Sequence, residues 1–204
     1  GSKDFVEYKQ DDIQDVICIG IGGSRLGPEL LSQAFENYSP NLNIHYCSSY
    51  DYIELENALK RCKAKSSLLV ISSKSFSTVE VISNAKKAIE WLHLNSTEDP
   101  SGQIIGISSN TKAMTELGIE ESNQFKILES LSGRYSVWSS ISLPAIISIG
   151  LDNFDEFKQG AFLADKHFLE NDWDSNIPVL MALLSLWNMN CLGIKNLGIF
   201  TYDY

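Results

Sequence analysis

The fold that this chain can adopt is constrained most by five short runs of apolar and β-branched residues. Segments of helical periodicity separate these runs. The first run, Val16 to Ile21, is continuously apolar and closed by glycines, which is typical of a strand buried on both faces. The clearest helical segment, Thr78 to Leu94, has apolar residues at three- and four-residue steps. This alternation predicts an α/β fold, a three-layer, doubly wound, five-stranded parallel sheet. The other four runs are residues 44–47, 68–72, 104–108 and 125–128.

The organisation changes after Arg134, because three helical segments follow without a strand between them, at residues 137–149, 155–169 and 177–191. A last apolar run at residues 197–202 again has the character of a strand. We expect a first domain over residues 1–150 and an extension over residues 151–204. The extension is predicted to hold helices and a strand that leads into a second domain, so the chain is interpreted as a truncated protein.

Composition excludes several classes of partner. A chain of 204 residues with 44% hydrophobic content can bury a core without a disulfide or a metal. The formal charge of −10 opposes binding to nucleic acid or to anionic lipid, so an anionic ligand requires a local cluster of donors.

The longest apolar stretch, Leu143 to Leu151, is too short to span a bilayer. The four cysteines form no CxxC pair and are interpreted as buried thiols of a cytoplasmic protein, at Cys18, Cys47, Cys62 and Cys191.

The loop after the first strand, Gly20 to Pro28, is rich in glycine. Glycines allow close approach of the backbone to a ligand, and a helix amino end attracts anions. Nucleotide motifs do not fit, since Arg25 replaces the third glycine of a dinucleotide fingerprint and Pro28 replaces the lysine of a Walker loop. The alternative is that the glycines only form a tight turn, with Pro28 in the first turn of the helix.

The loop after the third strand, Ser72 to Glu80, combines several hydroxyls with Lys74. Hydroxyls, backbone N–H groups, a helix dipole and one ammonium group together suit a phosphate dianion. Ser77 and Glu80 have the spacing of a capping box, which is a structural explanation for those two residues. It leaves Ser73, Lys74 and Ser75 unexplained.

The loop after the fifth strand, Ser132 to Ser136, carries Arg134. An arginine at this edge of a sheet is suited to stabilising an oxyanion. Taken alone, an arginine is more often a surface charge or part of a structural ion pair.

The segments GIGGSRLGP, SSKSFSTVE and SGRYSVWSSISLP resemble three signature stretches of the glucose-6-phosphate isomerase family, in the same order and with similar spacing. The resemblance continues to the final FTYDY. It implies that this chain is the first of two sugar isomerase (SIS) domains. It also implies that Gly23 and Ser24 contact a sugar phosphate and that Arg134 steadies a cis-enediolate. The phosphate site is implied to be lined by Ser73, Lys74, Ser75 and Thr78.

The activity implied is the interconversion of glucose 6-phosphate and fructose 6-phosphate, without a cofactor or metal, in a cytoplasmic homodimer. The family's catalytic glutamate lies beyond Tyr204, so the chain alone is predicted to be inactive. Arg25 stands where the family often has an aspartate, which reverses a charge near the glycine loop. The three histidines are interpreted as structural, at His45, His93 and His167.

Two alternatives remain open. One is a free-standing sugar-phosphate-sensing module of the SIS type, which would bind ligand and regulate a partner. The other, a dehydrogenase-type nucleotide domain, is disfavoured by Arg25 and Pro28.

Overall fold

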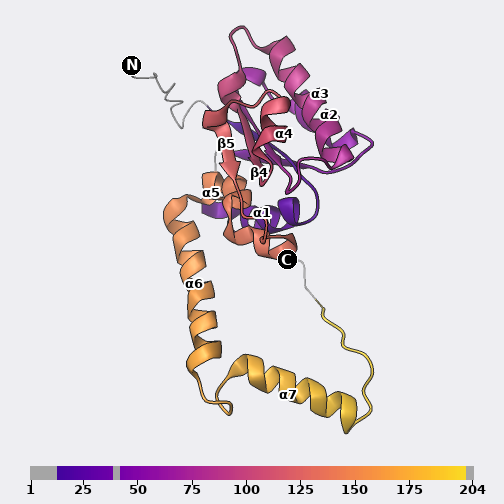
Figure 1. The fold of residues 1–204 in the computed structure, drawn as a ribbon, viewed down its shortest axis with the longest axis vertical. Helices are drawn as coiled ribbons and strands as arrows, with labels where there is room; N and C mark the ends of the chain where they lie inside the picture. The colour runs from indigo at the N-terminus through magenta and orange to yellow at the C-terminus, as the bar shows by residue number, and fades with distance from the viewer. Residues whose placement is uncertain (1–12, 39–41, 201–204) are drawn as a thin grey trace. The chain divides into compact units, whose positions relative to one another are not determined.

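The computed structural model describes residues 13–38 and 42–200, which divide into two compact units between Phe154 and Asp155 (Figure 1). The first unit contains a sheet of five parallel strands in the order β2-β1-β3-β4-β5. This order confirms the predicted fold class. The strands are β1 (Asp15–Ile19), β2 (Asn43–Cys47), β3 (Ser67–Ser72), β4 (Ile104–Ser108) and β5 (Gln124–Lys126).

Helices cover both faces of the sheet, which gives the three layers (Figure 1). One face packs against α2 (Ile53–Arg61), α3 (Val79–Asn95) and α4 (Thr111–Glu116). The other lies against the 3-10 turn η7 (Ser140–Ser142) and α5 (Leu143–Ile149), with α1 (Gly23–Ala34) packed on α5 and on the 3-10 turn η6 (Gly133–Trp138). Each connection between two parallel strands crosses one face of the sheet, as parallel pairing requires.

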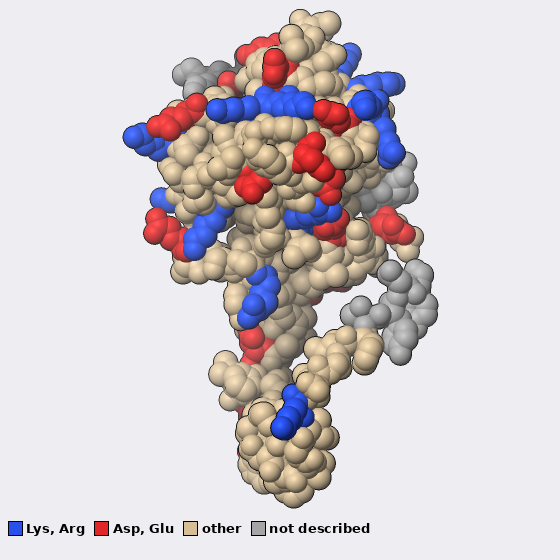
Figure 2. All heavy atoms as spheres, turned by 90° about the vertical axis from the view of Figure 1, so that its right-hand side faces the viewer, with Lys and Arg blue, Asp and Glu red and all other residues tan. Residues whose placement is uncertain are grey.

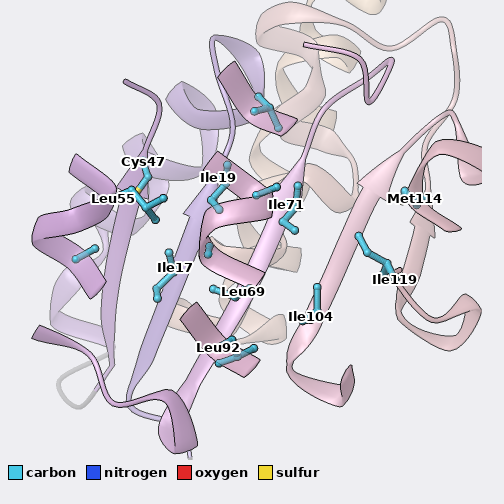
Figure 3. Packing of buried hydrophobic residues seen from close by; sticks show 14 of the residues in the cluster. Ile17, Ile19, Cys47, Leu55, Leu69, Ile71, Leu92, Ile104, Met114 and Ile119 are labelled. Carbon is cyan, nitrogen blue, oxygen red and sulfur yellow. The ribbon is translucent and has the colours of Figure 1, made fainter. Parts of the chain in front are cut away.

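The core follows from the alternation of side chains along the central strands. Ile17 of β1 lies opposite Leu69 of β3, and both are completely buried beneath α3 on one face, near Leu92 (Figure 3). Val16 and Val70 point to the other face and are equally buried. Because both faces are covered, the strands have no polar side, which explains their continuously apolar sequence.

Some predicted boundaries change. The helical segment at 137–149 is divided into η6, η7 and α5, and the next helix, α6 (Leu151–Glu170), begins directly after Gly150. The predicted strand at 197–202 is not formed over residues 197–200, and residues 201 and 202 lie outside the described part. A strand needs the hydrogen bonds of a neighbour, whereas Leu197 and Ile199 are 85% and 83% exposed.

The second unit contains most of α6 and all of α7 (Ile177–Asn190). Asn176 organises the connection between these helices. Its side-chain oxygen accepts a hydrogen bond from the Val179 N–H at 3.3 Å, and its amide donates to the Phe168 carbonyl at 2.8 Å. His167 accepts a hydrogen bond from the Ile177 N–H at 3.0 Å. Both side chains therefore hold the start of α7.

The four cysteines differ in their exposure to solvent. Cys18 and Cys47 are buried, Cys62 is half-buried and Cys191 is exposed at the end of α7, so the prediction of four buried thiols is wrong for Cys191. Burial raises the pKa of Cys47 and of Cys62 to about 12, which keeps both thiols protonated at neutral pH.

Among the described residues, no helix is both long and apolar enough to cross a membrane.

Candidate functional site

A polar pocket of about 190 Å³ lies where the loops after β1 and β3 meet the loop after β5. β1 and β3 are neighbours, and the strand order reverses between them, with β2 on one side and β4 on the other. A crevice at the carboxyl ends of the strands forms at such a reversal. The pocket brings together the six residues predicted to bind substrate: Gly23, Ser24, Ser73, Lys74, Ser75 and Thr78.

The glycine-rich loop forms the first wall. α1 begins at Gly23, and its cap residue Gly22 has a φ of 57°, in the left-handed region that favours glycine. The Ser24 N–H bonds to the Ile21 carbonyl at 3.1 Å, which closes the turn. The first turn of α1 has no acidic residue, so the positive end of the helix dipole faces the pocket uncompensated.

The hydroxyl-rich loop forms the second wall. Ser73 is buried, and its hydroxyl oxygen accepts a hydrogen bond from the Phe76 N–H at 3.2 Å and lies 3.4 Å from the Thr78 hydroxyl. Phe76 is 3% exposed and has a φ of 54°. Burial of its ring fixes a bend that a non-glycine residue rarely adopts. The bend leaves Lys74 and Ser75 exposed at the pocket.

The end of β4 anchors this loop from behind. The Lys74 carbonyl accepts hydrogen bonds from the hydroxyls of Ser108 and Ser109, at 2.9 and 2.8 Å, and from the Ser109 N–H at 3.1 Å. The Asn110 amide donates to the Ser75 carbonyl at 3.2 Å. Sequence reasoning missed these supporting residues. The run of small polar residues directly after β4 was the available signal.

The predicted capping box is not formed. The cap residue of α3 is Thr78, without a side-chain capping hydrogen bond, and the Ser77 hydroxyl instead donates to that of Ser75 at 2.8 Å. The helix begins one residue later than the box requires, which places Ser77 outside it. Ser77 therefore supports the pocket residue Ser75 and does not cap α3.

The loop after β5 closes the pocket with Ser132, Gly133 and Ser136, three residues that had no assigned contact. A Cβ placed on Gly23 would lie 2.2 Å from the Gly133 carbonyl oxygen, so the two loops meet backbone to backbone. Arg134 does not line the pocket. Its guanidinium group lies over the Tyr135 ring, 4.9 Å from the centroid, and is exposed.

Arg25, the unusual charge in the glycine loop, is held away from the pocket by carboxylates. It pairs with Glu29 at 2.8 Å and with Glu54 at 3.1 Å, and it donates to the Ser48 hydroxyl. Although burial on its own raises the pKa of Glu54, hydrogen bonds from the Ser48 N–H, from Arg25 and from the Ser49 N–H outweigh it and lower that pKa. The reversed charge is therefore compensated locally.

The pocket suits a small dianion. Among the described residues that line it, Lys74 is the one charged side chain, and none is an aspartate, glutamate or histidine. Hydroxyls, one ammonium group and the start of α1 converge there, while the whole chain has a formal charge of −10. The geometry is that of an α/β domain with a polar pocket suited to a phosphate ester.

The curated relatives that this chain matches are named glucose-6-phosphate isomerase. The family model described as phosphoglucose isomerase matches residues 1–204. Glucose-6-phosphate isomerase 1 of Chromohalobacter salexigens is 42% identical over 99% of this chain, and the enzyme of Hydrogenovibrio crunogenus is 39% identical over 96%. The crystal structure of a glucose-6-phosphate isomerase from Chlamydia trachomatis is 28% identical, with a TM-score of 0.78, over 90% of this chain and 36% of its own.

The chain belongs to the phosphoglucose isomerase family. It spans 37% of the length of the two curated relatives named above.

Proposed function

We propose that this chain is the sugar-phosphate-binding part of a glucose-6-phosphate isomerase and that the pocket between the three loops holds the phosphate of glucose 6-phosphate or fructose 6-phosphate. The observation that carries the proposal is the convergence of Ser73, Lys74, Ser75 and Thr78 with the amino end of α1 on one cavity. These groups donate hydrogen bonds and supply positive charge, as a dianion requires.

The binding mode follows from the two walls. The hydroxyls of Ser75 and Thr78 and the ammonium group of Lys74 would donate to the phosphate oxygens, while the backbone at Gly23 and Ser24 would contact the ligand from the other side. Ser73 would act mainly by holding the bend, since its hydroxyl already accepts from the Phe76 N–H. No metal or cofactor has a part in this scheme.

Isomerisation also needs a base that removes a proton from the carbon beside the carbonyl group. No described residue lining the pocket is a carboxylate or an imidazole, so the base would come from elsewhere in the protein. The 204-residue chain alone is therefore expected to bind without turnover. Arg134 would stabilise the enediolate only after its guanidinium group leaves the Tyr135 ring.

The organisation of the whole protein is part of the same proposal. Residues 151–204 would form an extension leading to a second domain, since the curated relatives named above are longer than this chain. A cytoplasmic homodimer that binds neither nucleic acid nor membrane is expected. The sensing-module alternative does not explain why the family match continues through α6 and α7.

Calorimetric titration of the 204-residue chain with inorganic phosphate and with glucose 6-phosphate tests the site. Lys74→Ala is expected to weaken binding of both ligands about 10-fold, the lower range for a hydrogen bond to a charged group. The matched control is Lys112→Ala, which removes a lysine of α4 that does not line the pocket. Equal affinity of Lys74→Ala and the unchanged chain would remove this loop from the site.

A coupled assay for conversion of fructose 6-phosphate tests the missing base separately. No turnover is expected from the chain alone. Sustained conversion would contradict the proposal that the base lies elsewhere, while leaving the binding result intact.

A further inference from the structure

A second cluster of reactive side chains lies at the opposite end of β1 from the sugar-phosphate pocket. Asp15 is the first residue of β1, His45 belongs to β2, and Cys62 caps the carboxyl end of α2. The carboxylate oxygen, the ring nitrogen and the sulfur lie within 4.8 Å of one another. At about 3.3 Å per residue, Asp15 and the loop after β1 are about 16 Å apart.

The register of the strands explains why these residues meet. Asp15 pairs with Asn43 and Ile17 with His45, so Asp15 and His45 are diagonal neighbours on the face of the sheet that packs against α2 and α3. Cys62 lies against the same apolar cluster. With Ser67, the partner of Asp15 in β3, the three side chains form a polar edge to a cluster that is otherwise mainly apolar.

The charge of Asp15 has little compensation in this position. Asp15 is 7% exposed, and its Oδ1 oxygen lies 3.0 Å from His45 Nε2 and 3.2 Å from the Asn43 amide nitrogen. Among the described residues, no lysine or arginine forms an ion pair with it. A carboxylate with so little access to solvent depends on the groups that contact it, and a bound cation would neutralise its charge.

We propose that Asp15, His45 and Cys62 form a binding site for a divalent transition-metal ion of the zinc type. An oxygen, an imidazole nitrogen and a thiolate are the three donors that zinc takes in proteins. Zinc bonds of about 2.0 to 2.3 Å place tetrahedral ligand atoms about 3.3 to 3.7 Å apart. The longest separation in the cluster, at most 4.8 Å, therefore needs to shorten by about 1 Å, while Asp15 Oδ1 and His45 Nε2, 3.0 Å apart, need to separate slightly. The Asn43 amide already orients the Asp15 carboxylate, as outer partners of metal ligands do.

The site is accessible and would have a structural effect. The His45 side chain is 20% exposed and Cys62 is half-buried, so an ion and a fourth, water ligand can reach the cluster from solvent. The three metal-ligating residues come from β1, β2 and the end of α2, so a bound ion would cross-link α2 to the sheet. Metal binding would release the thiol proton and raise the unfolding temperature. The expectation of a metal-free reaction is unaffected, because the cluster lies away from the sugar-phosphate pocket.

Titration of the 204-residue chain with Co²⁺ at mildly alkaline pH tests the proposal. A thiolate-to-cobalt charge-transfer band is expected, together with visible bands of a tetrahedral ion, and Zn²⁺ should displace both. Cys62→Ser is expected to abolish the charge-transfer band. Cys191→Ser, which removes an exposed thiol of the second unit, should retain it. Absence of the band in the unchanged chain, or its survival in Cys62→Ser, would overturn the proposal.

A second variant keeps the test decisive if Cys62→Ser does not fold. His45→Gln should lower the affinity for Co²⁺ more than about 10-fold, because substitution of a residue that only hydrogen-bonds to a metal ligand already lowers metal affinity about 10- to 100-fold. The matched control, His93→Gln, changes an exposed histidine of α3 and should bind as the unchanged chain does. Equal Co²⁺ affinity in the two histidine variants would show that Asp15 and His45 form only a hydrogen-bonded pair. Phosphate titration of both variants reports independently on the sugar-phosphate pocket.

Discussion

The two units differ in how they place their apolar side chains. In the first unit, Ile17, Leu69 and Ile71 are fully buried, because helices cover both faces of the sheet. In the second unit, α7 is apolar all round and has no charged residue. The lowest part of Figure 2, where α7 lies, is accordingly mostly tan. Its Met181, Leu184 and Trp187 are 64%, 61% and 59% exposed. An apolar sequence thus predicts burial only where the chain supplies an opposing layer.

This comparison predicts that leucines of the two units contribute very differently to stability. Leu69→Ala should lower the free energy of unfolding by about 2 to 5 kcal/mol, because it leaves a cavity between β3 and α3. Leu184→Ala, the matched change on exposed α7, should stay within about 0.5 kcal/mol. Urea unfolding followed by circular dichroism measures both, and similar losses would show that α7 is buried in solution.

The two units are also expected to respond oppositely to substitution of glycine by alanine. Gly23→Ala should cost about 1 to 3 kcal/mol, since the added methyl group meets the Gly133 carbonyl and the loops must separate. Gly160→Ala should stabilise by about 0.5 to 1 kcal/mol, because Gly160 lies inside α6 with open space around it.

The measurement for this pair combines thermal unfolding with phosphate titration. Phosphate affinity should fall only in Gly23→Ala, because only that change displaces a wall of the pocket. A Gly23→Ala variant with unaltered stability and affinity would contradict the close approach of the two loops.

The sequence predicted the sheet better than the site. Strands such as Val16 to Ile19 are apolar on both faces, a local pattern that directly reports burial between two layers. The pocket was located because the carboxyl ends of parallel strands share one edge, which brings Gly23 and Lys74 together without knowledge of any side-chain contact.

What the sequence could not predict depended on side-chain rotamers or on contacts between residues far apart in the chain. The position of Arg134 over the Tyr135 ring depends on rotamers, and the ion pairs of Arg25 depend on Glu54, which is 29 residues away in the chain. The capping box failed because the bend at Phe76, fixed by burial of its ring, delays the start of α3. The cluster of Asp15, His45 and Cys62 has no motif in the sequence, since its members come from three elements.

The smallest predicted difference between the units concerns their ion pairs at acid pH. The pKa of Glu54 is lowered in the folded first unit, so its contribution to stability is present above the ordinary glutamate range and is lost as the pH falls through the folded pKa. In the second unit, Glu170 faces Lys166 at 3.7 Å with both side chains more than half exposed, and such pairs contribute little. Unfolding temperatures measured from neutral to acid pH should therefore fall less steeply in Glu54→Gln than in the unchanged chain, while Glu170→Gln should keep the original slope. Parallel slopes in all three proteins would show that the contacts of Arg25, Ser48 and Ser49 with Glu54 do not persist in solution.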